Sequence, residues 1–338
     1  MRLAPSGRTL IVQPLPGIGD MVWHLPHIHA IAATTAAGRV DILTKPRSLA
    51  DRLLSADRSV DRVLWLERDA GRHAGVSGLF RLAALLRRET YQRVWLLHGS
   101  ARYALAAWLA GIPERIGYGA GLQRLLLSVP VRLPARYRHA QPMIRADALL
   151  ELLDVPSGEP EPRLAVSVEA ARVVAARFAA WPSPWIALGV GSSEPWKQWG
   201  AARFAELTLA LNRRGAGSVF IIGGPAERLL ADQIFAQVSS GRGRAADAVA
   251  LPLEQTAALL AVCRYYVGND TGVLNMAAAL QIPVIGLFGG SPPLTHSRFI
   301  RAVTPPAGER GMAAIAVVHV LEMLARLDRV YEENRNLT

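Results

Sequence analysis

The sequence is short of cysteine and of long apolar runs, and each shortage excludes a class of protein. Its 338 residues include one cysteine, Cys263, which excludes an internal disulfide framework and a cysteine zinc cluster. No apolar run approaches the ~20 residues of a membrane-spanning helix, and residues 9–15 are too short for a signal-peptide core. Hydrophobic residues still make up 51% of the chain. We therefore expect a globular cytoplasmic protein of about two domains.

Lysine is also scarce, although the chain is basic. Only Lys45 and Lys197 are lysines among 38 basic residues, and the formal net charge is +11. The excess lies in the first half, because residues 1–155 carry a net charge of +9 and residues 156–338 carry +2. An arginine-rich solvated surface is one explanation, and an anionic partner of the first half is the other. We do not expect nucleic acid binding, since no recognised motif accompanies the arginines.

Short apolar runs alternate with helical patterns along the chain. The expected strands are residues 9–15, 40–43, 63–66, 94–97, 185–190, 219–222, 265–267 and 284–288. The expected helices are a stretch ending near residue 35, then 48–55, 79–88, 101–110, 201–213, 226–238, 253–262, 272–280 and 312–334. Buried runs that alternate with helices indicate parallel sheets covered on both faces. The sequence therefore predicts an α/β protein.

A proline-rich break divides this pattern. Three prolines and a glycine fall within residues 155–162, and such a segment continues neither a helix nor a central strand. We expect an N-terminal Rossmann-like domain over 1–155, a linker over 156–163 and a C-terminal Rossmann-like domain over 164–338. The two doubly wound domains would face a central cleft, and the last helix could pack back on the first domain. Ligands of such sheets bind outside the carboxyl ends of the strands.

The first strand leads into residues 17–20, with the sequence GIGD. This segment is a poor dinucleotide fingerprint, because Val22 stands where the third glycine belongs and Asp41 comes too early for the ribose partner. Two interpretations of Asp20 remain open. It caps the helix that follows, or it is a carboxylate general base at the cleft.

Three junctions between a strand and a helix mark the second half, at residues 189–199, 222–227 and 267–272. The hydroxyl groups and Lys197 of the first junction suit phosphate oxygens, with help from a helix N-terminus. Glu227 of the second suits ribose hydroxyls. Taken singly, they are also an exposed turn, a first-turn glutamate and a helix cap. Together the three junctions predict a nucleotide-diphosphate site.

The usual metal-binding patterns are missing. His24, His27 and His29 cannot all lie on one helical face at these spacings, and no Asp-x-Asp or P-loop motif occurs. We therefore expect no metal and no cofactor. Lys197 and helix N-termini would then neutralise the diphosphate.

These motifs follow one another in a family's order. They are Gly19-Asp20 with Pro26, residues 97–99 with Arg102, residues 111–117, 192–199, 224–227, 253–254 and 270–272. The ordered set resembles the heptosyltransferase family of lipopolysaccharide biosynthesis, which comprises ADP-heptose-using glycosyltransferases of the GT-B fold. The resemblance covers nearly the whole chain.

The resemblance implies a role for each matching residue. Asp20 matches the catalytic base of the family. The donor site would comprise Ser192, Ser193, Lys197, Glu227, Leu251, Asp270, Thr271, Gly272 and Asn275. Asn275 departs from the family, which usually has histidine there, and asparagine keeps hydrogen bonding but carries no charge. For the acceptor we expect Gly19, Arg102 and Arg115.

The implied function is that of an inverting glycosyltransferase. Its donor would be ADP-L-glycero-D-manno-heptose, and its acceptor a lipopolysaccharide core or related anionic glycolipid. A phosphorylated lipid A core at the cytoplasmic face of the inner membrane would account for the basic first half. The alternatives are the use of another nucleotide sugar, a sugar-nucleotide epimerase of the same fold, and a non-catalytic anion-binding protein.

Overall fold

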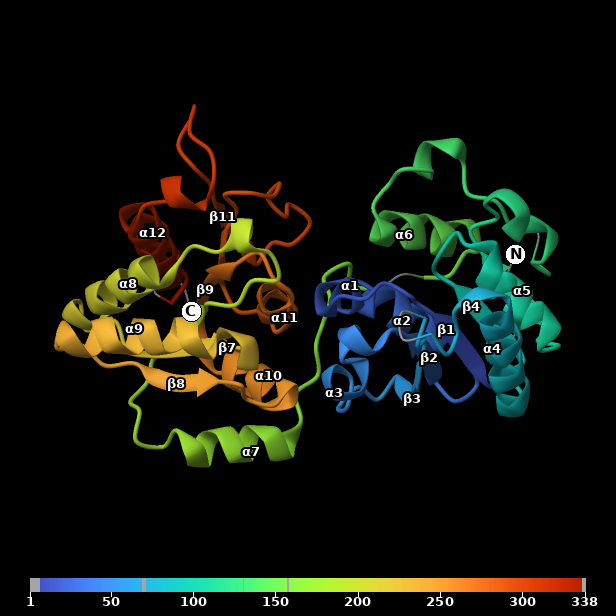
Figure 1. Cartoon of the computed structure of the whole chain (residues 1–338), viewed down its shortest axis with the longest axis horizontal. Coiled ribbons are helices and arrows are strands. Elements are labelled where there is room, and N and C mark those ends of the chain that lie inside the picture. Colours follow the sequence, from blue (N-terminus) through green and yellow to red (C-terminus); the bar gives the residue numbers. More distant parts are fainter. Residues whose placement is uncertain (1–6, 69–70, 130, 157, 336–338) are drawn as a thin grey trace. The chain divides into compact units, whose positions relative to one another are not determined.

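The chain forms two compact units, Met1–Leu164 and Ala165–Thr338. The computed structural model describes residues 7–68, 71–129, 131–156 and 158–335. Each unit contains one parallel sheet with helices packed on it (Figure 1). No helix of the described residues is long and apolar enough to cross a bilayer.

The first unit has a five-stranded sheet with the order β3-β2-β1-β4-β5, in which every pairing is parallel. Its strands are β1 (Thr9–Val12), β2 (Val40–Thr44), β3 (Val60–Trp65), β4 (Arg93–Leu96) and β5 (Glu114–Gly117). Its helices are α1 (Ile18–Trp23), α2 (Leu25–Ala33), α3 (Ala50–Leu53), α4 (Gly75–Glu89), α5 (Ala101–Leu109) and α6 (Pro142–Leu152). The strand order reverses between β1 and β4.

Helices α4 and α5 cover one face of this sheet. Leu79, Leu82 and Leu86 recur at helical spacing along α4 and are buried with Val94 of β4. A helix with such a stripe is stabilised by packing it on a sheet, at about 1.5–3 kcal/mol for each buried leucine. The packing fixes the sheet and therefore the loops at its edges.

The second unit has a six-stranded parallel sheet with the order β11-β10-β9-β6-β7-β8. Its strands are β6 (Trp185–Gly189), β7 (Ser218–Gly223), β8 (Ala246–Val249), β9 (Cys263–Asn269), β10 (Val284–Leu287) and β11 (Ile300–Val303). Its helices are α7 (Val168–Arg177), α8 (Ala201–Arg213), α9 (Arg228–Ser240), α10 (Leu253–Ala261), α11 (Gly272–Ala279) and α12 (Val317–Arg335). The order reverses between β6 and β9.

The α/β class with two doubly wound sheets is confirmed, while several details differ from the expectations. Strands β5, β8 and β11 and helices α6 and α7 were not expected from the sequence. The helix expected over 312–334 begins at Val317, after a 3₁₀ turn at Met312–Ala314, and α9 begins at Arg228 after another 3₁₀ turn. Helix α12 contacts α8, β10 and β11 of its own unit. Its packing on the first domain stays a prediction.

Candidate active site

The carboxyl edge of the second sheet brings two of the expected motifs together. Strands β6 and β9 are neighbours at the point where the strand order reverses. The segment 190–200 follows β6, and Asp270 follows β9. Carboxyl ends of parallel strands lie at one edge, and a reversal of order leaves a crevice for ligands there. The fold therefore supplies the place at which a nucleotide would bind.

Lys197 and Asp270 meet at this edge. The Lys197 Nζ lies 2.6 Å from Asp270 Oδ2, and the Ser291 hydroxyl donates to the same oxygen at 2.7 Å. Lys197 Nζ also lies 5.1 Å from the ring centre of Trp196. An ammonium group has three donors, so the ion pair leaves others for phosphate oxygens. Sequence reasoning missed Ser291, whose only signal is its position soon after β10.

Asn269 holds the segment that contains Lys197. Its buried side-chain amide donates to the carbonyl oxygens of Val190 at 3.2 Å and Gly191 at 3.0 Å, and it accepts the Trp199 N–H at 3.3 Å. Asn269 is not among the residues expected from the sequence to form the site. The available signal was a polar residue at the end of an otherwise apolar strand, where burial demands hydrogen-bond partners.

The remaining donor-site residues lie on the same loops. The Ser192 hydroxyl donates to the Glu194 carbonyl at 2.7 Å, and Glu227 accepts the Gly224 N–H at 2.7 Å. Both contacts also stabilise their own turns. Other expected donor residues are Ser193, which is exposed, Leu251, between β8 and α10, and Thr271 and Gly272, where α11 begins. Their roles as ligands stay predictions.

Asn275 lies one turn into α11 with an unused acceptor. Its exposed fraction is 8%, and its side-chain oxygen has no hydrogen-bond partner among the described residues. Its backbone N–H donates to the Thr271 carbonyl. A buried carbonyl oxygen without a partner is unfavourable, so a donor hydroxyl from a ligand would improve its environment.

Asp20 lies in α1, which follows β1 after a segment of residues 13–17, with Gly19 in the same turn. Its Oδ2 accepts the Gly17 N–H at 3.0 Å, so it does cap the helix. Burial raises the pKa of Asp20 above its ordinary value, although the Gly17 N–H opposes the shift. A carboxylate with a raised pKa is a better general base near neutral pH. The cap and the base are therefore compatible.

Arg102 and Arg115 are used by the backbone of the first unit. Arg102 donates to the carbonyl oxygens of His73 and Gly75, both at 2.7 Å. Arg115 donates from Nε to the Leu126 carbonyl at 2.6 Å, and burial lowers its pKa. These bonds fasten loops, and they give both arginines a structural role that the sequence analysis did not foresee. Their role as acceptor contacts stays a prediction.

Comparison with known proteins identifies the family. The sequence model of glycosyltransferase family 9 (heptosyltransferase) matches residues 79–310. The chain belongs to glycosyltransferase family 9. Lipopolysaccharide heptosyltransferase 2 of Salmonella typhimurium is 29% identical to it over 245 residues, which are 66% of this chain and 69% of that protein. This protein is therefore a glycosyltransferase.

Solved structures agree with this family. The structure of E. coli ADP-heptose lipopolysaccharide heptosyltransferase II has a TM-score of 0.76 and 25% identity, covering 96% of this chain and all 100% of that one. A family 9 glycosyl transferase from Veillonella parvula has a TM-score of 0.78 and 18% identity, covering 95% and 97%. The latter likeness shows the fold alone.

The three clustered histidines of this family 9 glycosyltransferase each have a partner. A ring nitrogen of His24 lies 2.6 Å from the Asp20 carbonyl oxygen, His27 pairs with Asp147 at 2.8 Å, and His29 pairs with Asp57 at 2.7 Å. Burial lowers the pKa of His24 to about 4. In the part of the chain that the structure describes, no group of three or more metal-ligating side chains could hold a metal ion.

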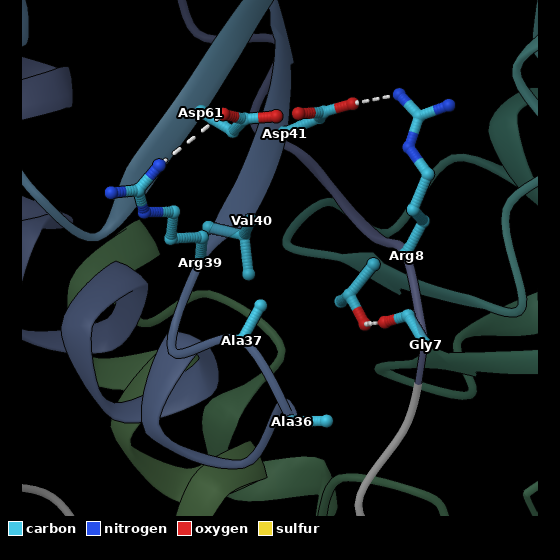
Figure 2. A pocket seen from close by; sticks show the side chains of 9 residues that line it. Gly7, Arg8, Ala36, Ala37, Arg39, Val40, Asp41 and Asp61 are labelled. Carbon is cyan, nitrogen blue, oxygen red and sulfur yellow. Dashed lines mark hydrogen bonds and ion pairs between the residues drawn. The ribbon is translucent and has the colours of Figure 1, made fainter.

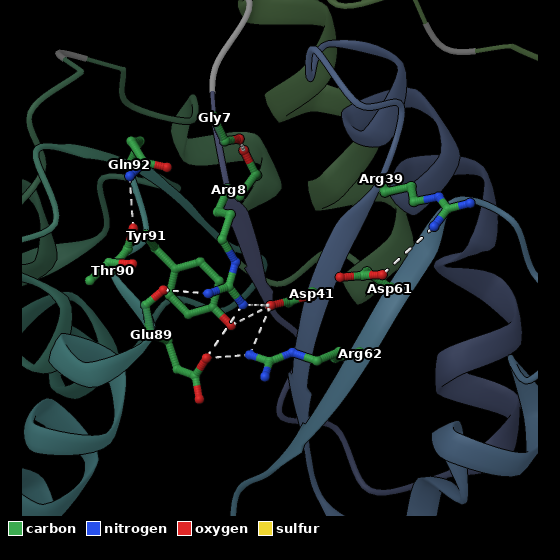
Figure 3. A network of polar contacts seen from close by, with 11 residues as sticks. Gly7, Arg8, Arg39, Asp41, Asp61, Arg62, Glu89, Thr90, Tyr91 and Gln92 are labelled. Carbon is green, nitrogen blue, oxygen red and sulfur yellow. Dashed lines mark hydrogen bonds and ion pairs between the residues drawn. The ribbon is translucent and has the colours of Figure 1, made fainter.

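The amino edge of the first sheet carries a separate polar cluster. A hollow of about 380 Å³ lies there, and Figure 2 shows Arg39 paired with Asp61 among its lining residues. Figure 3 shows the buried Asp41 carboxylate, which accepts from Arg8 and from the Tyr91 hydroxyl, both at 2.7 Å. Asp41 stands near the start of β2, far from the carboxyl edge. This agrees with the argument that it is no ribose ligand.

Proposed function

We propose that this glycosyltransferase moves a heptose from ADP-L-glycero-D-manno-heptose to an anionic acceptor of the lipopolysaccharide core. The carrying observation is the Lys197–Asp270 pair beyond the carboxyl ends of β6 and β9, where we place the diphosphate. Relatives named lipopolysaccharide heptosyltransferase 2 support the sugar and the acceptor class. A solved E. coli heptosyltransferase of the same fold holds ADP, which supports the nucleotide.

The proposed reaction is a single displacement with inversion. Asp20 takes the proton of the acceptor hydroxyl, the oxygen forms a bond to the anomeric carbon, and the bond from that carbon to ADP breaks. The diphosphate leaves with the electron pair. Lys197 and the free N–H groups of the loops around Ser192 and Thr271 stabilise its charge. In this proposal the protein's own cation neutralises the diphosphate, and no metal or other cofactor is required.

We place the donor on the second unit and the acceptor on the first. The first half of the chain carries most of the net charge, at +9 for residues 1–155, which suits a phosphorylated glycolipid. The acceptor is part of a membrane lipid, so we propose peripheral contact with the cytoplasmic face of the inner membrane. The turn Gly121–Leu125 supports this, since Leu122 and Leu125 each expose 71% of their surface beside Arg124.

The test follows ADP release by the purified chain. With ADP-heptose and a heptose-deficient core acceptor, ADP should appear together with the glycosylated acceptor. Without acceptor, release should nearly stop. Calorimetry should show tighter binding of ADP than of UDP or GDP. The three nucleotides differ only in their nucleosides, so a comparison of their Kd values reports which base the site prefers.

Two outcomes favour the alternatives. Tighter binding of UDP or GDP would indicate another nucleotide sugar. Conversion of the donor to an epimer without any acceptor would indicate an epimerase. A UDP-GlcNAc 2-epimerase from Neisseria meningitidis resembles this chain in fold, with a TM-score of 0.51.

A further inference from the structure

A second hollow opens at the carboxyl end of β5 in the first unit. It has a volume of about 590 Å³ and begins at Tyr118, directly after the strand. Its other polar lining residues are Arg132, Tyr137, Arg138 and Arg145, and the rest of its wall is small or apolar. None of these residues belongs to the site expected from the sequence.

Two buried polar groups on this wall have no hydrogen-bond partner among the described residues. Tyr118 has an exposed fraction of 2%, and its hydroxyl bonds to no residue that the structure describes. The buried Arg145 Nε likewise has no acceptor in the described part of the chain. The Arg145 guanidinium lies 4.4 Å from the centre of the Tyr118 ring, so the two groups stand together. Leaving buried donors unsatisfied is costly, and a bound acceptor of hydrogen bonds would remove that cost.

The charge of the hollow has one sign. Three arginines line it, and no carboxylate does among the described residues. Asp147 lies on the same helix as Arg145, but it pairs with His27 at 2.8 Å. Burial and the nearby cations Arg145, Arg68 and Lys45 lower the pKa of His98, which follows β4, so its neutral form is favoured. The hollow therefore suits an anion.

The position of the hollow relates it to Asp20. Both lie beyond the carboxyl edge of the same sheet, Asp20 after β1 and Tyr118 after β5. Strand β4 lies between these two strands, and neighbouring strands are about 4.8 Å apart, so their ends stand roughly 10 Å apart. Arg145 reaches inward from the hollow, because a Cβ added at Gly99, after β4, would lie 3.0 Å from its Nη2.

We propose that this hollow binds an anionic group of the acceptor, a phosphate or a carboxylate, while Asp20, at the same edge of the sheet, deprotonates the acceptor hydroxyl. The inference rests on the proposed function for the identity of the acceptor. Arg132, Arg138 and Arg145 supply charge, and the Tyr118 hydroxyl donates a hydrogen bond. Acceptors that lack the anionic group would bind weakly, which makes the hollow a determinant of specificity.

The test titrates the whole ligand-free chain with inorganic phosphate and, separately, with glucuronate, by calorimetry. Arg138→Gln and Arg145→Gln should each weaken anion binding by about 10-fold or more, as loss of a charged hydrogen-bond donor does. Tyr118→Phe keeps the ring beneath Arg145 and should weaken binding by about 3- to 10-fold. Arg88→Gln is the matched control, because it removes the same charge from an exposed position on α4.

The outcomes separate this proposal from the proposed function. Tighter binding of phosphate than of glucuronate would indicate a phosphorylated acceptor, and the reverse a sugar acid. The proposal is overturned if neither anion binds, or if Arg138→Gln, which changes an exposed residue and should fold, binds both as the wild type does. Arginine-dependent anion binding by a chain that transfers no heptose would sustain the hollow and refute the proposed function. ADP affinity should be the same in all four variants.

Discussion

At the scale of single residues, Asp20 has both a structural role as a helix cap and a proposed chemical role as the general base. Its Oδ2 accepts the Gly17 N–H, while burial raises its pKa. We expect Asp20→Asn to keep the cap, since an amide oxygen also accepts the N–H. The variant should lose about 100-fold or more in kcat, because it cannot take a proton, and should bind ADP normally. Steady-state rates with calorimetry check this, and near-normal turnover would remove the assignment of the base.

The same residue should make stability depend on pH. Because the folded-state pKa is raised, the folded chain holds a proton that the unfolded chain has already released between the two pKa values. Stability therefore falls as pH rises through that window. Asp20→Asn has no carboxyl group that titrates here, so its stability should not fall in this window. The Tm of the variant relative to that of the wild type should therefore increase as the pH rises from below the ordinary aspartate pKa to neutrality. A difference in Tm that stays constant across this range would contradict the burial argument.

Lys197 offers a second test at this scale. Lys197→Met keeps the length of the side chain and removes its charge. ADP affinity should fall by about 10- to 100-fold, as expected for a lost charge-assisted contact. Lys45→Met is the control, since it changes the chain's only other lysine in the same way. Calorimetry with ADP measures both. If Lys197 serves only its pair with Asp270, Lys197→Met will lower the Tm and leave the Kd for ADP unchanged.

At the scale of elements, the end of β6 depends on a glycine. A Cβ added at Gly189 would lie 1.8 Å from the hydroxyl oxygen of the buried Tyr266, while one added at Gly191 would meet its nearest neighbour, in Glu227, at an ordinary 3.6 Å. Gly189→Ala should therefore destabilise the protein by about 1–3 kcal/mol or more through overpacking. Gly191→Ala, two residues away, should change stability much less. Chemical denaturation compares the two, and equal losses would show that the close approach is not the cause.

The strands that sequence reasoning missed have a physical feature in common. Strands β5, β8 and β11 are all edge strands of their sheets. An edge strand has one neighbour and more solvent, so its sequence need not be a continuous apolar run. In β5, Glu114 and Arg115 precede Ile116 and Gly117, and only the last two are buried. The central strands, such as β1 and β4, are buried throughout, and the sequence predicts them correctly.

The candidate site divides along similar lines. Residues in the turns and helix starts that follow central strands, such as Asp20 and Asp270, could be found from the pattern of a strand, a turn and a helix. Ser291 and Tyr118 could not, because their partners come from distant parts of the chain. Ser291 bonds to Asp270 across 21 residues, and Tyr118 packs on Arg145. Only the packing of the elements brings such groups together.

At the scale of the whole molecule, the uneven charge acquires a specific meaning. The basic first half contains the arginine-lined hollow and Asp20, whereas the nearly neutral second half contains the crevice with Lys197. An anionic lipid surface would attract the first half and concentrate the chain where a lipid-linked acceptor resides. Charge alone gives reversible attachment, and exposed apolar side chains add to it.

We therefore expect the chain to bind vesicles that contain anionic lipid and to release them as salt rises, since screening weakens the attraction. The double variant Leu122→Ser and Leu125→Ser should bind several-fold more weakly, because it removes the exposed apolar side chains of the turn Gly121–Leu125. Leu229→Ser is the control, as it removes an equally exposed leucine, at 78%, from the second unit. Sedimentation with vesicles at several salt concentrations measures all three proteins. Equal losses of vesicle binding in the control and the double variant would place the lipid contact elsewhere. Binding that does not depend on salt would exclude the electrostatic attraction between the basic first half and the lipid surface.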